Sequence, residues 1–105
     1  MKVVTLCGST RFKDTFFDAA SDFTKQGYII LMPLVFHHTD EPDLSVEEKI
    51  QLDNLHKMKI DMSDAIYVIN KDGYIGESTY GEIDWARKHN KEIYFMEEIK
   101  ENTEG

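Results

Sequence analysis

Apolar residues along the chain follow two alternating patterns, short dense runs and longer stretches in which they recur every three or four positions. The dense runs, rich in Ile, Val and Leu, predict four strands, at positions 2–7, 28–36, 65–70 and 92–96. The spaced stretches predict three helices, at about 11–25, 45–61 and 79–89. Strands and helices therefore alternate, which favours right-handed crossovers between parallel strands and helices on both faces of one sheet.

We accordingly expect an α/β fold, a small doubly wound (Rossmann-like or flavodoxin-like) sheet of four parallel strands in the order 2-1-3-4 with three helices. A chain of 105 residues predicts one domain, which we place at 1–97, with 98–105 as a loose acidic tail. Ser45 and Glu48 have the spacing of a capping box and mark the start of the second helix. In such a sheet, ligands bind in the crevice outside the carboxyl ends of the strands.

Charge and composition limit the partners. The formal net charge of −8 opposes binding to a nucleic-acid polymer, which needs clustered Lys and Arg, but it allows a small phosphorylated ligand. The sequence contains no run of about 18 apolar residues, so we expect no membrane span. The first strand is too short for a signal peptide. The single cysteine, Cys7, cannot form an internal disulfide, so we expect a reducing, cytoplasmic setting.

A first candidate loop, Cys7-Gly8-Ser9-Thr10-Arg11, leaves the first strand and opens the first helix. Gly8 permits a tight turn, Ser9 and Thr10 offer hydroxyl groups, and Arg11 carries a planar fork suited to phosphate. A plain strand-to-helix turn with a hydroxyl cap explains the same residues equally well. The loop lacks the further glycines of a dinucleotide fingerprint and the ending of a P-loop, so we expect no NAD, ATP or other cofactor.

A second candidate loop runs from Asp72 to Glu82, between the third strand and the third helix. This position places the Glu82 carboxylate on the first helical turn, beside the ligand crevice, where it could attack a sugar carbon. Thr79 and Glu82 also have the spacing of a capping box, in which Glu82 would bind the backbone N–H of Thr79 and have no chemical role. The sequence leaves both interpretations open.

These two loops together resemble a known group of proteins. Cys7-Gly8-Ser9-x-Arg11 near the N-terminus, with Glu82-x-x-x-Ala86 after the third strand, resembles the nucleoside 2-deoxyribosyltransferase-like superfamily. Within it, the first motif is most similar to that of the nucleoside 5′-monophosphate N-glycosidases. Thr79-x-x-Glu82 also resembles the Gly-Thr-x-x-Glu element of the cytokinin-activating phosphoribohydrolases. The similarity spans most of the chain, from Lys2 to about Met96.

The resemblance implies a role for each loop. It implies that Glu82 is the catalytic carboxylate and that the first loop faces the sugar or phosphate of a nucleoside or nucleotide. It also implies a homodimer in which the neighbouring subunit helps to close the pocket. The residues that we assign to substrate binding come from both loops: Gly8, Ser9, Thr10, Arg11, Gly76, Ser78 and Thr79.

The chain also departs from these relatives. Many of them carry Ser or Asp six residues before the catalytic Glu, where this chain has Gly76. The Asp that binds the sugar in relatives falls near His56, with Asp53 and Asp61 as neighbours that could substitute. These departures keep a second function open, that of a module that binds a nucleotide derivative without cleaving it. A third possible function is that of a minimal interaction domain.

The implied reaction breaks an N-glycosidic bond through an oxocarbenium-like state that a nearby carboxylate stabilises or attacks. We expect the helix N-terminus to favour the ionised form of Glu82, by about 0.3–1 kcal/mol. Asp72 and Glu77 are the acids available to protonate the leaving base. Hydrolysis and transfer to a second base are both possible. We expect no metal site, because His37 and His38 are adjacent and no ligand partner has a suitable spacing.

Overall fold

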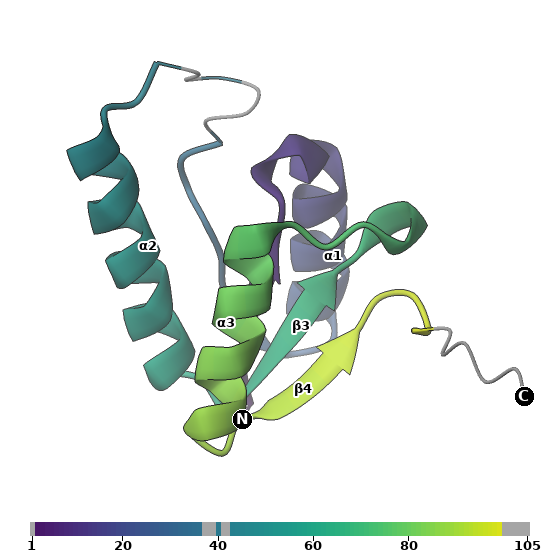
Figure 1. The fold of residues 1–105 in the computed structure, drawn as a ribbon. Coiled ribbons are helices and arrows are strands. Elements are labelled where there is room, and N and C mark those ends of the chain that lie inside the picture. The colour runs from purple at the N-terminus through teal and green to yellow at the C-terminus, as the bar shows by residue number, and fades with distance from the viewer. Residues whose placement is uncertain (1, 37–39, 41–42, 100–105) are drawn as a thin grey trace, which may run out of the picture.

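The structure is a computed structural model that describes residues 2–36, 40 and 43–99. Within these residues nine elements follow one another: β1 (Val3–Gly8), the 3₁₀ turn η1 (Thr10–Phe12), α1 (Lys13–Lys25), β2 (Ile29–Leu31), α2 (Val46–Asp61), β3 (Ala65–Ile69), the 3₁₀ turn η2 (Lys71–Gly73), α3 (Glu77–Lys88) and β4 (Glu92–Phe95). Figure 1 shows β3 and β4 next to each other beside α3, with α2 at the far left. His37, His38 and residues 100–105 of the expected acidic tail lie outside the described residues.

The four strands form one parallel sheet in the order β2-β1-β3-β4, as the sequence predicted. β3 pairs with β1 along its whole length, from Ala65 opposite Val4 to Ile69 opposite Gly8. The two strands therefore end together, so the loops that follow them begin side by side. The predicted small α/β doubly wound fold is confirmed, with three α-helices among the described residues.

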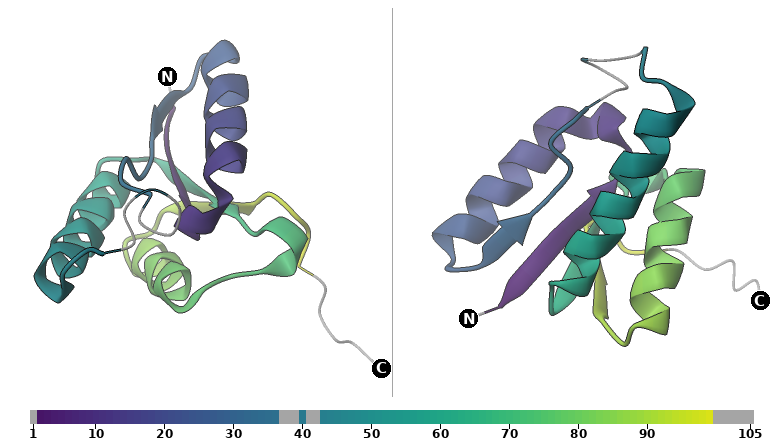
Figure 2. Two further views of the ribbon diagram at one scale, coloured as in Figure 1. Left: turned by 90° about the horizontal axis from the view of Figure 1, so that it is seen from above. Right: turned by 90° about the vertical axis from the view of Figure 1, so that its left-hand side faces the viewer.

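The helices divide between the two faces of the sheet. α1 lies on one face, while α2 and α3 lie together on the other (Figure 2). On the α1 side, Phe16 is fully buried in a cluster with Leu6 and Ile69. On the other side, Ile60 of α2 and Ile83 of α3 pack with Ile66, Val68, Cys7 and Ala86. The core thus consists of two clusters, one on each face of the sheet, and β1 and β3 contribute residues to both.

The boundaries of two elements differ from the sequence prediction. The second strand, expected over 28–36, spans only Ile29–Leu31, because the chain leaves the sheet before Pro33, which has no N–H to pair. The third helix begins at Glu77 and not at Thr79, with Gly76 as its N-cap. The capping box that was predicted for the second helix is present: Ser45 N donates to Glu48 Oε1 at 2.9 Å, and Glu48 N donates to Ser45 Oγ at 3.0 Å.

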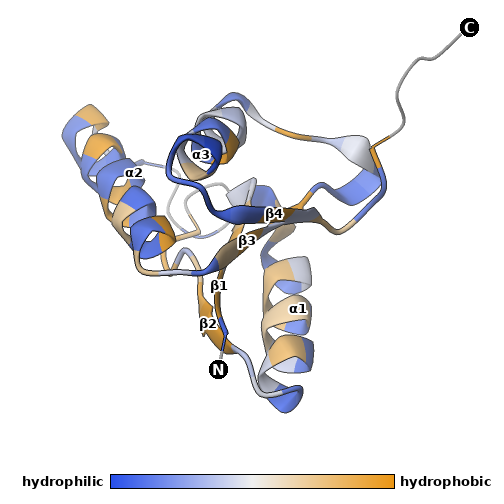
Figure 3. Cartoon of the chain, turned by 90° about the horizontal axis from the view of Figure 1, so that it is seen from below, coloured by the Kyte–Doolittle hydropathy of each residue, from blue (hydrophilic) through white to orange (hydrophobic). Residues whose placement is uncertain are grey.

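The solvent-facing side of α2 carries several apolar side chains. Only His56 and Ile60 of this helix are buried, whereas the apolar side chains of Val46, Ile50, Leu55 and Met58 are exposed. Figure 3 shows this mixed character around α2. Within the described residues, no helix is both long and apolar enough to cross a bilayer.

Gly8, at the end of β1, is required by a close approach to β3. Its φ is +151°, and a Cβ placed there would lie 2.8 Å from the carbonyl oxygen of Ile69. Gly8 and Ile69 belong to the two central strands, β1 and β3, so neither residue can move without disturbing the sheet.

We predict that Gly8→Ala lowers the free energy of unfolding by about 1–3 kcal/mol, the usual cost of forcing an extra methyl group into packed structure. Gly81→Ala is the matched control. Gly81 lies in α3, and a Cβ added to it would have no neighbouring group within 4 Å, so alanine there should stabilise by about 0.5–1 kcal/mol. Urea unfolding measures both changes. A Gly8→Ala variant as stable as the wild type would contradict this account of the turn.

Candidate functional site

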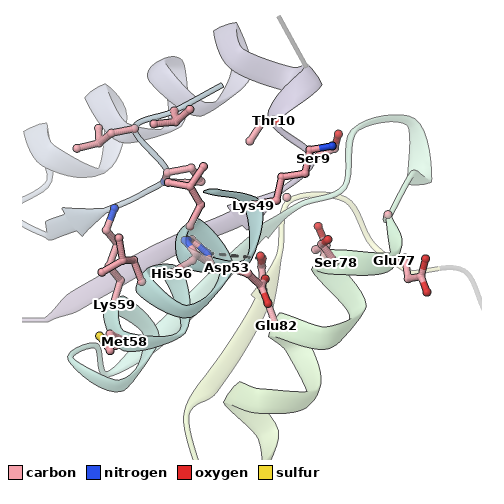
Figure 4. A pocket seen from close by; sticks show the side chains of 18 of the residues that line it. Ser9, Thr10, Lys49, Asp53, His56, Met58, Lys59, Glu77, Ser78 and Glu82 are labelled. Carbon is pink, nitrogen blue, oxygen red and sulfur yellow. Dashed lines mark ion pairs between the residues drawn. The ribbon is translucent and has the colours of Figure 1, made fainter. Parts of the chain in front are cut away.

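A pocket of about 690 Å³ begins at the carboxyl end of β1 and extends between α2, the start of α3 and the segment after β2. Its lining includes the polar side chains of Ser9, Thr10 and Ser78 and the apolar side chains of Leu34, Leu52, Leu55, Met58 and Met62. Figure 4 shows the polar groups converging from three elements. The pocket lies where the fold predicts a ligand crevice.

Glu82 lines this pocket from the second turn of α3, and only 8% of its surface is exposed. Because the helix already begins at Glu77, Thr79 lies inside it and is itself buried. Glu82 therefore does not form a capping box with Thr79, and the helix has no side-chain cap at Gly76. Of the two interpretations that the sequence left open for Glu82, the capping box with Thr79 is therefore wrong.

Three polar side chains from three elements meet at the base of the pocket. His56 Nε2 of α2 lies 3.3 Å from Cys7 Sγ of β1 and 3.5 Å from Glu82 Oε1 of α3 (Figure 4, dashed line). All three residues are buried. His56 Nδ1 and Glu82 Oε1 have no hydrogen-bond partner among the described residues. Buried polar atoms without partners are uncommon and point to a ligand or to chemistry.

Burial removes the charge from this cluster at neutral pH. It raises the pKa of Glu82 to about 8, helped by the nearby Asp53 carboxylate and partly offset by the neighbouring Cys7 thiol. It lowers the pKa of His56 to about 4 and raises the pKa of Cys7 well above its ordinary value. The contact between His56 and Glu82 is therefore made by two neutral groups at pH 7, not by an ion pair.

This result corrects the expectation that the helix N-terminus keeps Glu82 ionised. The macrodipole effect is confined to the first turn and is worth about 0.3–1 kcal/mol, whereas Glu82 lies in the second turn and is buried. Desolvation of the carboxylate is the larger effect here.

Only some of the substrate-binding residues that were predicted in the first loop line the pocket. Gly8, Ser9 and Thr10 line the pocket. Arg11 does not line it: its guanidinium lies 4.4 Å from the ring centre of Tyr74, and its Nε donates to Ser9 Oγ at 3.1 Å. Since both Ser9 and Tyr74 are pocket residues, Arg11 is held at the rim.

The predicted site residues of the second loop likewise do not all line the pocket. Gly76, Ser78 and Thr79 line the pocket with Glu82, and so does Glu77. Asp72 does not, because the chain after β3 turns toward β4 through η2, where the backbone N–H of Asp72 donates to Glu97 Oε2 at 2.9 Å. Asp72 lines a separate cavity with Asn70, Tyr80, Arg87 and Glu97. The structure therefore does not bring Asp72 to Glu82.

Sequence reasoning assigned neither His56 nor Lys49 to the site and named Asp53 only as a possible substitute for the relatives' sugar-binding Asp, yet all three line the pocket. His56 lies one turn before Ile60 on the buried side of α2, and this single polar position among buried residues is the signal that could have identified it. Asp61, the other carboxylate considered near His56, instead accepts a hydrogen bond from Trp85 Nε1 at 2.8 Å.

Comparison with solved structures supports the fold. A solved structure described as "2-desoxiribosyltransferase from Leishmania mexicana" aligns with a TM-score of 0.66 at 16% sequence identity, over 90% of this chain and 63% of that chain. The chain thus spans less than two thirds of that protein's length. The fold implied by the resemblance to the deoxyribosyltransferase-like superfamily is confirmed. No protein-family model matches the chain, and no curated protein matches it.

We predict that the free energy of unfolding falls as the pH rises from 6.5 to 8. In this window the folded protein holds the Glu82 proton that the unfolded chain, with a carboxyl pKa near 4.5, has already lost. The fall should total about 2 kcal/mol at about 1.4 kcal/mol per pKa unit. His56, with its pKa moved from 6.5 to about 4, acts in the opposite direction, mainly below pH 6.5.

Urea unfolding of the wild type and of Glu82→Gln at several pH values measures this effect, because glutamine keeps the shape of the side chain and cannot lose a proton. The difference in stability between the two proteins should widen in favour of the variant up to about pH 8. Parallel curves for the two proteins would show that the Glu82 carboxyl group is not buried as the structure has it.

Proposed function

We propose that the protein cleaves, or transfers the glycosyl group of, a nucleoside or nucleoside 5′-monophosphate, with the Glu82 carboxylate as the nucleophile. The observation that carries this proposal is a buried carboxyl oxygen, Glu82 Oε1, that has no hydrogen-bond partner among the described residues and lies at the wall of a pocket of about 690 Å³. The likeness in fold to a deoxyribosyltransferase structure also supports it.

The polar and the apolar parts of the pocket lining suit the two halves of a nucleoside. Hydroxyl groups of Ser9, Thr10 and Ser78 and the backbone at Gly8 can hydrogen-bond a sugar. Apolar side chains of the lining, including those of Leu52 and Met58, offer a surface for the flat face of a base. Pockets for small ligands commonly combine an apolar surface with a few polar groups in this way.

The reaction would proceed by displacement at the anomeric carbon. Glu82 must first lose its proton; the ionised carboxylate then attacks, the carbon–nitrogen bond breaks, and the electron pair leaves with the base. The departing base needs a proton, for which Glu77 replaces Asp72 as the acid that lines the same pocket. Water releases the sugar in a hydrolase, and a second base takes it in a transferase.

Arg11 is the residue that would distinguish a phosphorylated substrate. It lies at the rim beside Ser9 and Tyr74, and its fork would have to leave the Tyr74 ring to bind a 5′-phosphate. Lys49 is a second cation at the pocket, whereas Lys59 Nζ already donates to the carbonyl oxygen of Met32 at 2.7 Å.

We also propose a homodimer, because the exposed apolar side chains of Leu34, Leu55, Met58 and Met62 lie along the outer wall of the pocket. A second copy that covered them would remove apolar surface from water and narrow the pocket. Sedimentation velocity at micromolar concentration tests this proposal, since it separates a monomer from a dimer by mass.

A module that binds a nucleotide derivative without cleaving it is the alternative function. Two observations favour it: Glu82 is protonated at neutral pH, with a pKa of about 8, and His56 occupies the base of the pocket near the point where the relatives' sugar-binding Asp falls. Such a module would gain thermal stability from its ligand without consuming it.

We predict release of free base when the protein is incubated with a panel of nucleosides and nucleoside 5′-monophosphates in buffer containing a metal chelator. The rate should rise with pH up to about 8, because attack requires the ionised form of Glu82. Glu82→Gln should lower the rate by ~10³-fold or more, the scale of loss when a nucleophile is removed. Chromatography of the free base measures the rate.

Glu47→Gln is the matched control, since Glu47 is exposed in the first turn of α2 and does not line the pocket. Base release that persists in Glu82→Gln would contradict the assignment of the nucleophile. A rate that falls between pH 6 and 9 would indicate that Glu82 donates a proton instead. A rise in melting temperature with the ligand but no base release would identify the binding module.

A further inference from the structure

The Cys7–His56–Glu82 cluster brings together three different metal-ligating groups. A thiol, an imidazole and a carboxyl group each offer one ligand atom, and these atoms all lie within 4.8 Å of one another. Thiolate and imidazole together suit a borderline-soft divalent ion such as Zn²⁺, and carboxylate is its third common ligand. His56 and Cys7 are 49 positions apart, so no local spacing in the sequence indicates the cluster.

Two of the three distances within the cluster match those around a tetrahedral ion, and the third pair of ligand atoms, from Cys7 and Glu82, lies within 4.8 Å. Zinc binds sulfur, nitrogen and oxygen at roughly 2.0–2.3 Å, which places neighbouring ligand atoms of a tetrahedron about 3.4–3.6 Å apart. His56 Nε2 lies 3.3 Å from Cys7 Sγ and 3.5 Å from Glu82 Oε1. The side chains would therefore need little movement to hold an ion between them.

A second observation points to a ligand at the same place. Glu82 is more than nine-tenths buried, and its Oε1 has no hydrogen-bond partner among the described residues although it faces His56 Nε2. A buried carboxyl oxygen without a partner costs free energy unless some group satisfies it. A cation held by Cys7 and His56 would supply the missing interaction.

We propose that Cys7, His56 and Glu82 form a binding site for Zn²⁺ or a similar first-row divalent ion, with the fourth position open to the pocket. His56 and Glu82 line that pocket, while Cys7 is fully buried behind them. Three protein ligands and one open position are typical of zinc sites that take part in reactions, whereas structural sites are closed by four. The ligands bind in their deprotonated forms, and their protons leave to solvent.

The proposed ion and the proposed glycosyl chemistry exclude each other. A carboxylate oxygen that binds the ion cannot attack an anomeric carbon at the same time. His56 Nδ1 has no hydrogen-bond partner among the described residues, so the site lacks the outer contact whose loss typically weakens metal binding about 10–100-fold. The ion is therefore expected to be exchangeable, and to inhibit base release rather than to support it.

The test uses the full chain without a histidine tag, freed of metal with a chelator and then dialysed. Titration with Co²⁺ should give a thiolate-to-metal absorption band that saturates at one ion per chain, and Zn²⁺ should displace the cobalt. Cys7 is the only cysteine in the chain, so this band can come from no other residue. No substrate is needed, and base release is measured separately in chelator, so each proposal can fail without the other.

Cys7→Ala should abolish the band and weaken Zn²⁺ binding by more than ~100-fold, since it removes a direct ligand and not an outer contact. His56→Ala and Glu82→Gln should weaken binding comparably. Control variants that alter the other histidines, His89→Ala and a double His37→Ala, His38→Ala change, should bind as the wild type does. Circular dichroism of each variant establishes that it is folded.

Two results would overturn the proposal. One is the absence of a thiolate-to-cobalt band in the wild type at saturating Co²⁺. The other is Zn²⁺ affinity that is equal in the wild type and in Cys7→Ala, which would assign binding to other side chains. If His56→Ala does not fold, the band of the wild type and its loss in Cys7→Ala still decide between the outcomes.

Discussion

Burial of the Glu82 carboxyl group against Cys7 and His56 is the constraint on which the rest of the site depends. It exists because β1 and β3 end in register, so that the end of β1 and the start of α3 lie side by side. α2 then crosses the same face of the sheet and inserts His56 between them. The geometry of a parallel sheet thus places three distant residues within contact and removes them from water, and their unusual protonation follows from that.

Most of the fold could be predicted from the sequence, because alternating strand and helix patterns leave few topologies. The strand order, the three helices and the Ser45–Glu48 capping box were all predicted, and the structure confirms them. The boundaries that differed depend on tertiary structure. Local residues do not show that the chain leaves the sheet before Pro33, or that Gly76 and not Thr79 begins α3.

The candidate site could be predicted in part. Glu82 and the loop around Ser9 were found from motifs, because each lies next to a strand end and is recognisable locally. His56 could not be found this way, because its role depends on contacts with residues from two other elements. For the same reason the protonation of Glu82 was predicted wrongly: sequence shows the helix that carries a carboxylate, but not how completely the neighbouring helix and strand exclude water from it.

The most direct test of this account is the titration of the Glu82 carboxyl carbon by nuclear magnetic resonance, in protein labelled with ¹³C at glutamate and kept in metal chelator. The Glu82→Gln variant assigns the signal by its disappearance. Burial predicts a midpoint well above the ordinary value of 4.5 and close to 8. A midpoint near 4.5 would contradict the account, since it would mean that water reaches this carboxylate as freely as it reaches those on the surface.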